Sequence, residues 1–338
     1  MYLTPTRHAL RTARTRRAGR ISTAAAVATT VGVLAAAGST AAASVTASVS
    51  ADTLTVNGGS GADRIALRLA AGEPGTLQVD AGDDGTADFS FDRATFSRIH
   101  LLGGSGADEL RIDQVNGAFA DEQITMDGGS GDDVMNGGDG AERFLGSSGS
   151  DQADGNRGDD TGVMGSGNDT FRWDPGDGSD VVEGESGTDT LDFNGAGANE
   201  NMSLTANGQR SLFLRDVANI RMDMDGVERL HLTALGGVDT MRVGDLTGTD
   251  VEEAIVDLSG LTGGGDGQAD TVTVEGTLGA DAIQATTDGS AVVVDGLTAT
   301  TRVTGAELID TLVLDGRGGN DAIDVDDAAT ALIGVQIP

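Results

Sequence analysis

Acidic residues recur at every ninth position between Gly128 and Asp192, with one interruption, and carboxylates at a fixed spacing can bind metal ions. The repeated acids are Asp133, Glu142, Asp151, Asp160, Asp169, Asp180 and Asp189. The stretch holds 16 acidic residues against 3 arginines, so folding it would bring like charges together unless cations lay between them. Hard Ca²⁺ prefers about six to eight oxygen ligands, which carboxylates and backbone carbonyls can supply. The spacing and charge therefore indicate that these residues bind cations.

The residues around each acid belong to a nine-residue unit that repeats through this stretch. Nine-residue units begin at Gly128, Gly137, Gly146, Gly155, Met164, Pro175 and Gly184, and the residues Trp173 and Asp174 are inserted before Pro175. The fourth position of every unit is glycine, which permits turn conformations that other residues disfavour. The eighth position is large and apolar in most units: Met135, Phe144, Phe171, Val182 and Leu191.

This pattern resembles the RTX, or haemolysin-type, calcium-binding nonapeptide GGxGxDxUx. In that family the first six residues of a unit form a turn and the last three a short strand, so we expect the apolar eighth residue to point inward. The resemblance thus implies a parallel β-roll in which two units complete one coil and calcium lies between turns eighteen residues apart on the same side. It would pair Asp133 with Asp151, Asp151 with Asp169, and Glu142 with Asp160. The inserted residues Trp173 and Asp174 lengthen the next two pairs, Asp160 with Asp180 and Asp169 with Asp189, to a separation of twenty residues. We therefore expect the insertion to bulge or to end one row of ions.

Four single copies of the motif lie outside this array and place an acid at the same position: Asp63, Asp108, Asp281 and Asp321. None has a neighbouring copy nine or eighteen residues away, so we expect glycine turns that lead into strands, with ion binding as the alternative. Short apolar or alternating runs follow these copies. Their spacing near twenty, from Val274 through Val294 to Leu314, predicts rungs of a larger β-solenoid.

Together these patterns predict an all-β chain, a parallel β-roll or β-solenoid built from nonapeptide repeats, without a long helix after the N-terminal segment. We expect an N-terminal solenoid segment over residues 44–127 and the calcium-binding array over residues 128–192. A C-terminal solenoid segment with degenerate repeats is expected over residues 193–338.

Residues 1–43 have the features of an export signal. Six arginines lie among the first twenty residues, residues 21–43 are uncharged and rich in alanine, and cleavage is expected after Ala43 or as late as Ala51. The prediction is a secreted protein without stable membrane insertion after cleavage. The alternative is a surface protein anchored through an uncleaved segment. The chain contains no cysteine, so disulfides cannot stabilise it outside the cell, and ions are the expected substitute.

Composition also limits the partners and the chemistry. The formal net charge of −33 repels nucleic acids and anionic lipids and attracts cations, so calcium is the expected partner, and a cell-surface or matrix partner stays open. The sequence has no HExxH or GxSxG motif and no cysteine nucleophile. We therefore predict a non-catalytic surface or matrix component. The alternative is a small calcium-dependent carbohydrate enzyme, with Asp223 and Asp225 as paired acids on one strand face.

Overall fold

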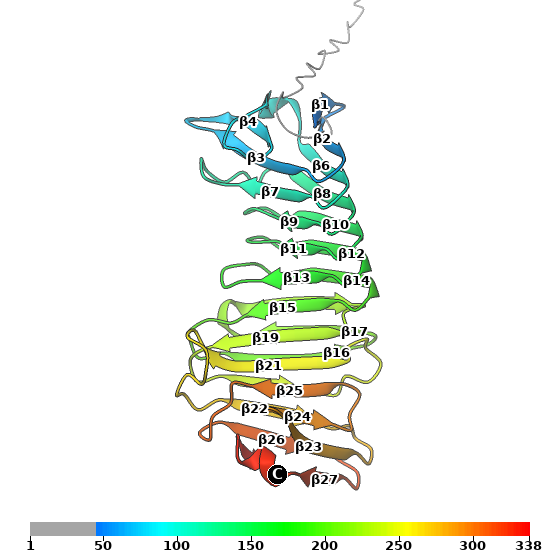
Figure 1. Cartoon of the computed structure of the whole chain (residues 1–338), viewed down its shortest axis with the longest axis vertical. Helices are drawn as coiled ribbons and strands as arrows, with labels where there is room; N and C mark the ends of the chain where they lie inside the picture. The colour runs from blue at the N-terminus through cyan, green and yellow to red at the C-terminus, as the bar shows by residue number, and fades with distance from the viewer. Residues whose placement is uncertain (1–44) are drawn as a thin grey trace, which may run out of the picture. The chain divides into compact units, whose positions relative to one another are not determined.

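The computed structural model describes residues 45–338 and confirms the predicted all-β fold (Figure 1). The chain passes back and forth between two sheets of 14 strands each as it coils. The predicted export signal at residues 1–43 lies outside the described residues. Among the residues that are described, no helix is long and apolar enough to cross a membrane.

The strands of the two sheets follow one another in space as follows. Sheet A contains β1 (Thr46–Ser50), β2 (Thr53–Ser60), β6 (Arg98–Ser105), β8 (Gln123–Ser130), β10 (Glu142–Ser148), β12 (Thr161–Gly167), β14 (Val181–Gly187), β18 (Ile220–Asp225), β17 (Arg210–Arg215), β16 (Asn201–Asn207), β20 (Thr240–Val243), β22 (Thr271–Glu275), β26 (Thr311–Asp315) and β28 (Gly334–Gln336). Sheet B contains β27 (Ala322–Val325), β23 (Ala282–Asp288), β24 (Ala291–Asp295), β25 (Thr300–Thr304), β21 (Glu253–Gly260), β19 (Arg229–Leu235), β15 (Thr190–Asn194), β13 (Thr170–Trp173), β11 (Gln152–Asp154), β9 (Val134–Asn136), β7 (Glu109–Asp113), β3 (Arg64–Ala70), β4 (Glu73–Ala81) and β5 (Phe89–Asp92). The helical segments are the 3-10 turns η1 (Arg93–Thr95) and η2 (Val217–Asn219) and the short helix α1 (Asp327–Thr330).

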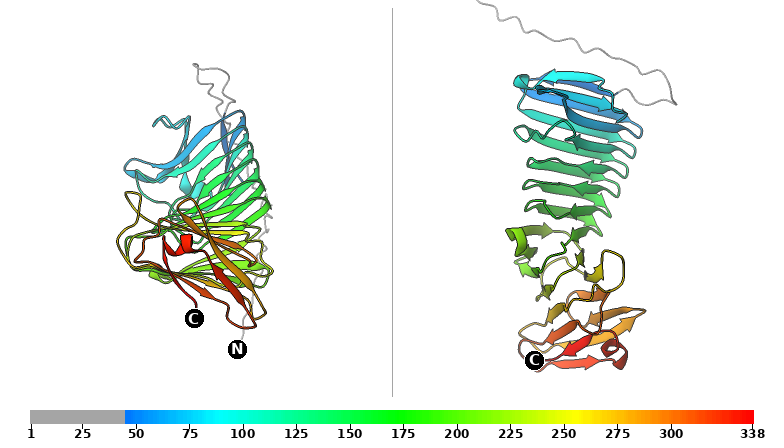
Figure 2. Two further views of the ribbon diagram at one scale, coloured as in Figure 1. Left: turned by 60° about the horizontal axis from the view of Figure 1, so that its bottom comes forward. Right: turned by 90° about the vertical axis from the view of Figure 1, so that its left-hand side faces the viewer.

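Successive coils of the array stack strand on strand in parallel register. In sheet A, Phe144 of β10 pairs with Met126 of β8 on one side and with Gly162 of β12 on the other. Parallel neighbours need a crossover connection, and here a strand of the opposite sheet provides it. Figure 2 shows the regular stacking of these strands through the array.

Antiparallel hairpins lengthen some coils outside the array, as in β3–β4–β5, β16–β17–β18 and β23–β24–β25. They also change the predicted rung spacing near the C-terminus. Val274 pairs with Leu314 in sheet A, forty residues further along the chain, whereas Val294 lies on β24 in sheet B. The predicted spacing of twenty is therefore wrong here, because β24 belongs to a hairpin and does not form a coil of its own.

One apolar core runs through the described residues, from Ala47 to Ile333. The alternation of buried and exposed residues along the strands produces it, since successive side chains point to opposite faces. The five large eighth-position residues of the array are all buried, as predicted. The equivalent positions of two other units hold only Ala153 and Gly162, so the core of the array contains fewer large side chains there.

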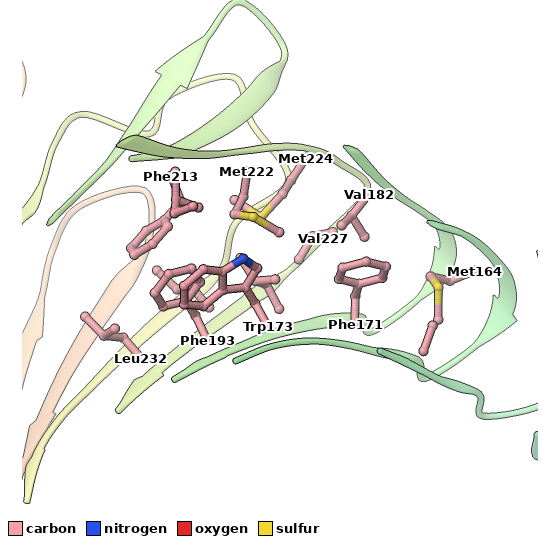
Figure 3. Packing of buried hydrophobic residues seen from close by; sticks show 14 of the residues in the cluster. Met164, Phe171, Trp173, Val182, Phe193, Phe213, Met222, Met224, Val227 and Leu232 are labelled. Atoms are coloured by element: carbon pink, nitrogen blue, oxygen red, sulfur yellow. The ribbon is translucent and has the colours of Figure 1, made fainter. Parts of the chain in front are cut away.

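The inserted residue Trp173 ends β13 and lies fully buried in this core. Its ring stacks on Phe193 with 4.1 Å between ring centroids, and Phe193 in turn lies 4.5 Å from Phe213 (Figure 3). The following turn is closed by a hydrogen bond from the Asp177 amide to the Asp174 carbonyl. The insertion thus forms a bulge that adds the only tryptophan of the chain to the core.

Candidate cation-binding rows

The turns that lead into sheet B place one aspartate directly before each of six strands, β3, β7, β9, β11, β13 and β15. These residues form what we call the B-row: Asp63, Asp108, Asp133, Asp151, Asp169 and Asp189. Each amide N–H in the row donates to Oδ1 of the next aspartate, at 2.7 to 2.8 Å. Glu228 continues the row, because its Oε2 accepts the Asp189 amide N–H at 2.7 Å. The predicted stacking of Asp133, Asp151 and Asp169 is therefore confirmed.

The second oxygen of each B-row carboxylate has no partner. All six residues are buried, at most 6% exposed, and Oδ2 of every one lacks a hydrogen bond. Within the described residues, no arginine forms an ion pair with any of the six. A buried polar atom without a partner costs free energy, and a carboxylate oxygen costs more than a neutral group. The row as a whole is thus a line of buried acceptors in need of positive charge or protons.

Two residues that the sequence left isolated, Asp63 and Asp108, belong to this row. Asp63 lies 45 residues before its neighbour in the row, Asp108, and Asp108 lies 25 residues before Asp133. The β3–β4–β5 hairpins lie in the chain between Asp63 and Asp108, and a long turn between β7 and β8 lies between Asp108 and Asp133. The pairing of β3 with β7 and of β7 with β9 keeps the register across both insertions. The expected glycine turns that lead into strands are therefore confirmed, since β3 and β7 follow directly, but these turns stack in the row and are not isolated in space.

The turns that lead into sheet A hold a second, shorter row, the A-row, formed by Glu142, Asp160 and Asp180. The Glu142 amide donates to Asp160 Oδ1 at 2.7 Å, and the Asp160 amide donates to Asp180 Oδ1 at 2.8 Å. The second of these steps spans twenty residues, as does the step from Asp169 to Asp189 in the B-row. The insertion at Trp173 therefore bulges outside the turns and ends neither row.

The two C-terminal single copies stack differently. The Asp281 amide donates to Asp321 Oδ1 at 3.0 Å, so the pair has the same register as the rows. Both residues are partly exposed, however, and the Asp281 carboxylate accepts the amide of Thr277 at 2.7 Å and its hydroxyl at 3.0 Å. Because its oxygens have partners, Asp281 lacks the free buried oxygen that marks the B-row.

Burial shifts the pKa values of both rows upward. In the B-row, burial and then the neighbouring carboxylates raise the pKa of Asp151 to about 7 and that of Asp133 to about 6. In the A-row, burial raises the pKa of Asp160 to about 9 and those of Glu142 and Asp180 to about 7. At neutral pH, without a cation, the folded rows resist ionisation that the unfolded chain would allow.

This electrostatic arrangement predicts how the metal-free protein responds to pH. A raised pKa in the folded state means that the folded chain binds protons more tightly, so the free energy of unfolding should fall as pH rises from about 4 through about 7 to 9. In urea titrations of metal-free protein, the unfolding midpoint should be higher at pH 5 than at pH 8. Asp160→Asn should reduce this difference. A metal-free midpoint that is constant or rises over this interval would contradict the prediction.

The first glycine of several motif copies, namely Gly58, Gly103, Gly146 and Gly184, faces both kinds of oxygen that calcium binds. A methyl group built on Gly146 would lie 2.5 Å from Asp151 Oδ2 and 2.2 Å from the carbonyl oxygen of Met164 in the next coil. At Gly103 the corresponding carboxylate and carbonyl oxygens lie 2.4 Å and 2.6 Å from the same point. The missing side chain thus leaves a free carboxylate oxygen and a carbonyl oxygen facing the same small space.

Gly146→Ala should therefore destabilise the array, because the neighbours of the new methyl group include backbone that cannot move away. We expect a loss of about 1 to 3 kcal/mol, the usual cost of overpacking. Gly197→Ala is the matched control, since a methyl group there meets nothing within 4 Å. Urea unfolding of both variants in calcium measures the difference, and equal stabilities would show that the first glycine is not sterically required.

The donor set fits calcium only if backbone oxygens take part. Within residues 45–338, no three Asp, Glu or His side chains come close enough together to hold one metal ion. The rows offer carboxylates from adjacent coils and carbonyls of glycine turns, which are hard oxygen donors. They contain no histidine or cysteine, so softer metals find no preferred ligand there.

Sequence reasoning missed several acids at equivalent turn positions, namely Glu122, Glu200, Asp239, Asp270 and Asp310, all of which are buried. Glu122 and Glu200 lie directly before β8 and β16, and each pairs with an arginine, Arg93 and Arg215 respectively. A usable signal was present in the sequence, since an aspartate followed by threonine opens a strand in seven places. The aspartate is exposed in one of them, Asp52 before β2, and buried in the other six: Asp160, Asp169, Asp189, Asp239, Asp270 and Asp310.

The acids Asp223 and Asp225, considered as a catalytic pair, lie on β18 among arginines. Asp223 accepts hydrogen bonds from Arg210 and from Arg221, the latter at 2.6 Å. Although burial alone would raise it, these arginines lower the pKa of Asp223. Asp225 is 3.6 Å from Arg210. The lowered pKa of Asp223 is the opposite of the raised pKa that a general acid needs.

The fold and the two rows are thus the basis for assigning a function. A comparison with protein-family models finds no match for the chain, and a search of curated proteins finds none either.

Proposed function

We propose that the chain is an exported calcium-binding β-roll protein of the RTX type, in which calcium ions between stacked turns join each coil to the next. The B-row carries this proposal, because six buried aspartates have free oxygens without arginine partners. At Gly58, Gly103, Gly146 and Gly184, the free Oδ2 of a B-row aspartate and a carbonyl oxygen of the next coil face the same small space. Bound calcium would supply the positive charge that these oxygens lack.

Several features favour calcium over other divalent ions. The available donors are carboxylate and carbonyl oxygens in flexible glycine turns, which suit the variable geometry of Ca²⁺. Mg²⁺ demands near-octahedral geometry and releases its waters reluctantly, so it should substitute poorly. The candidate ligands are Asp133, Glu142, Asp151, Asp160, Asp169, Asp180 and Asp189 in the array, extended along the B-row by Asp63 and Asp108.

We further propose a non-catalytic role outside the cell, as a surface or matrix component. The uncharged segment at residues 21–43 after six arginines supports export. Apart from that N-terminal region, 54 acidic residues face 15 arginines, and this excess would keep the chain soluble and expanded until ions arrive. The arginine partners of Asp223 weaken the case for the enzyme. Activity assays on polysaccharides in calcium should accordingly show no cleavage.

The stacking makes a specific prediction about how many ions each aspartate serves. Asp151 lies between Asp133 and Asp169, whereas Asp63 is the first member of the B-row and has one neighbour in it. Asp151→Ala should therefore remove about two calcium ions per chain, and Asp63→Ala at most one. Calorimetric titration of the metal-free variants gives both numbers.

A matched control is the exposed residue Asp324 on β27, for which Asp324→Ala should leave the calcium count unchanged. Asp108→Ala provides a further comparison, because the structure gives this residue two neighbours in the row. Equal losses for Asp63 and Asp151 would overturn the assignment of ions to the gaps between stacked aspartates.

A further inference from the structure

A third line of stacked acids lies beyond the array, on the turns before β16, β20, β22 and β26. We call it the C-terminal row, and it consists of Glu200, Asp239, Asp270 and Asp310. Each amide donates to Oδ1 of the next acid, at 2.8 to 3.0 Å, across separations of 39, 31 and 40 residues. These separations do not follow the nonapeptide period. In the array the first glycine of a unit lies five residues before the acid, but the residue at that position before Asp239 is Ala234.

The two ends of this row are already satisfied by the protein. Glu200 forms a buried ion pair with Arg215, and its Oε2 also accepts the amide of Ala196 at 2.8 Å. At the other end, Asp310 Oδ2 accepts the amide of Glu307 at 2.6 Å. Neither end therefore needs a further partner.

The middle of the row is different. Asp239 is 2% exposed, its Oδ1 accepts the Glu200 amide, and its Oδ2 has no hydrogen-bond partner. Asp270, the next member, is equally buried, and no arginine among the described residues pairs with either aspartate. Burial, and then the carboxylates of Asp270, Glu200 and Asp266, raise the pKa of Asp239 to about 7.

A glycine-rich loop is fastened beside these two aspartates. The Asp266 carboxylate accepts the Gly237 amide at 3.2 Å and the Gln268 amide at 2.8 Å, which ties the loop at residues 261–268 to the turn that contains Asp239. An open groove of about 530 Å³ lies between the loop and the turn, lined by Gly236, Gly237 and Asp266 among others. The groove therefore lies beside the turn that contains Asp239, and the carbonyl oxygen of Ala198 faces Gly237 in that turn.

We propose that Asp239 and Asp270 bind one calcium ion together with backbone carbonyls of the adjoining turns, with Asp266 as the residue that positions the loop. The site shares no residue with the array and lies outside the repeat pattern. It differs from the Glu200 end of the same row in a simple way: there an arginine supplies the positive charge, whereas at Asp239 a metal ion does. The unpartnered Oδ2 of Asp239 is the oxygen that the ion would satisfy.

The test is the calcium count of the full chain carrying Asp239→Asn, a change that keeps the size of the side chain. Equilibrium dialysis against calcium should give one ion per chain fewer than the parent protein. The same loss is expected for Asp270→Asn, which serves as the second variant if the first one does not fold. Asp324→Asn, on an exposed strand position, is the matched control and should lose none.

The difference between variant and parent separates this site from the array. If the array bound no ions, the parent would still bind one and Asp239→Asn none, so the two proposals fail independently. Circular dichroism in calcium establishes that each variant is folded. An unchanged calcium count in folded Asp239→Asn and Asp270→Asn would overturn the proposal, because it would show that the Asp239 carboxyl is simply protonated.

Discussion

Removal of calcium at neutral pH should unfold the coils between residues 128 and 192, while much of the C-terminal part keeps its structure. The array brings seven acids into two buried rows, and burial raises the pKa of Asp151 to about 7 and that of Asp160 to about 9. Its core is thin where Ala153 and Gly162 occupy inward positions. Ordering costs about 1 to 2 kcal/mol per residue, so ion binding must offset much of this cost.

Hydrogen exchange read by mass spectrometry locates the change. The amides of Gln152 and Thr170 donate to carbonyls of the neighbouring coils at 2.8 Å, so they should be protected in calcium and exchange freely in chelator. The amides of β25, which pairs with β21 in the more apolar C-terminal part, should stay protected in both conditions. Stacked coils contact mainly their neighbours, which permits such local melting. Equal protection of the array amides with and without calcium would contradict this expectation.

Arg215→Met should be the most destabilising single change outside the array. The side chains of Arg215 and Glu200 are 3% and 0% exposed, so loss of the arginine leaves a buried carboxylate without its counter-ion. Removing one partner of a buried pair typically costs about 3 to 5 kcal/mol. Arg215 also lies 5.1 Å above the ring of Trp173, and Nη1 donates to the Val217 carbonyl at 3.2 Å, so further contacts are lost.

Urea unfolding followed by the fluorescence of Trp173, the only tryptophan, measures this loss. The control is Arg98→Met, which removes an exposed pair with Asp52 whose side chains are 51% and 54% exposed. Exposed pairs contribute about 0 to 1 kcal/mol, so this variant should unfold near the parent midpoint. A loss below about 1 kcal/mol for Arg215→Met would mean that Glu200 does not depend on the arginine.

The regular part of the site was predictable because its geometry is periodic. The fixed step of nine residues made the resemblance to the RTX nonapeptide recognisable, and the pairing of Asp133 with Asp151 followed from the two units per coil that this resemblance implies. The inward direction of Phe144 and Phe171 followed in the same way.

The rest depends on coils of unequal length. Asp63 joins the B-row across 45 residues because β3 pairs with β7, and no local pattern specifies that long-range pairing. Trp173 looked like an interruption of the repeat, but its ring fills the core beside Phe193 and Phe213, a role that depends on strands far along the chain. Asp239 carries only the short signal of an aspartate before threonine at a strand start, and its burial depends on residues 31 and 39 positions away.

The number of calcium ions bound per chain tests the central claim most directly. The B-row contains five gaps between stacked aspartates, and the A-row contains two gaps between stacked acids. Equilibrium dialysis of the metal-free full chain against millimolar calcium, with metal analysis of the protein, should therefore give about seven ions from the two rows. One or no bound ion would contradict the account, because the buried aspartates would then have to be neutralised by protons and not by calcium.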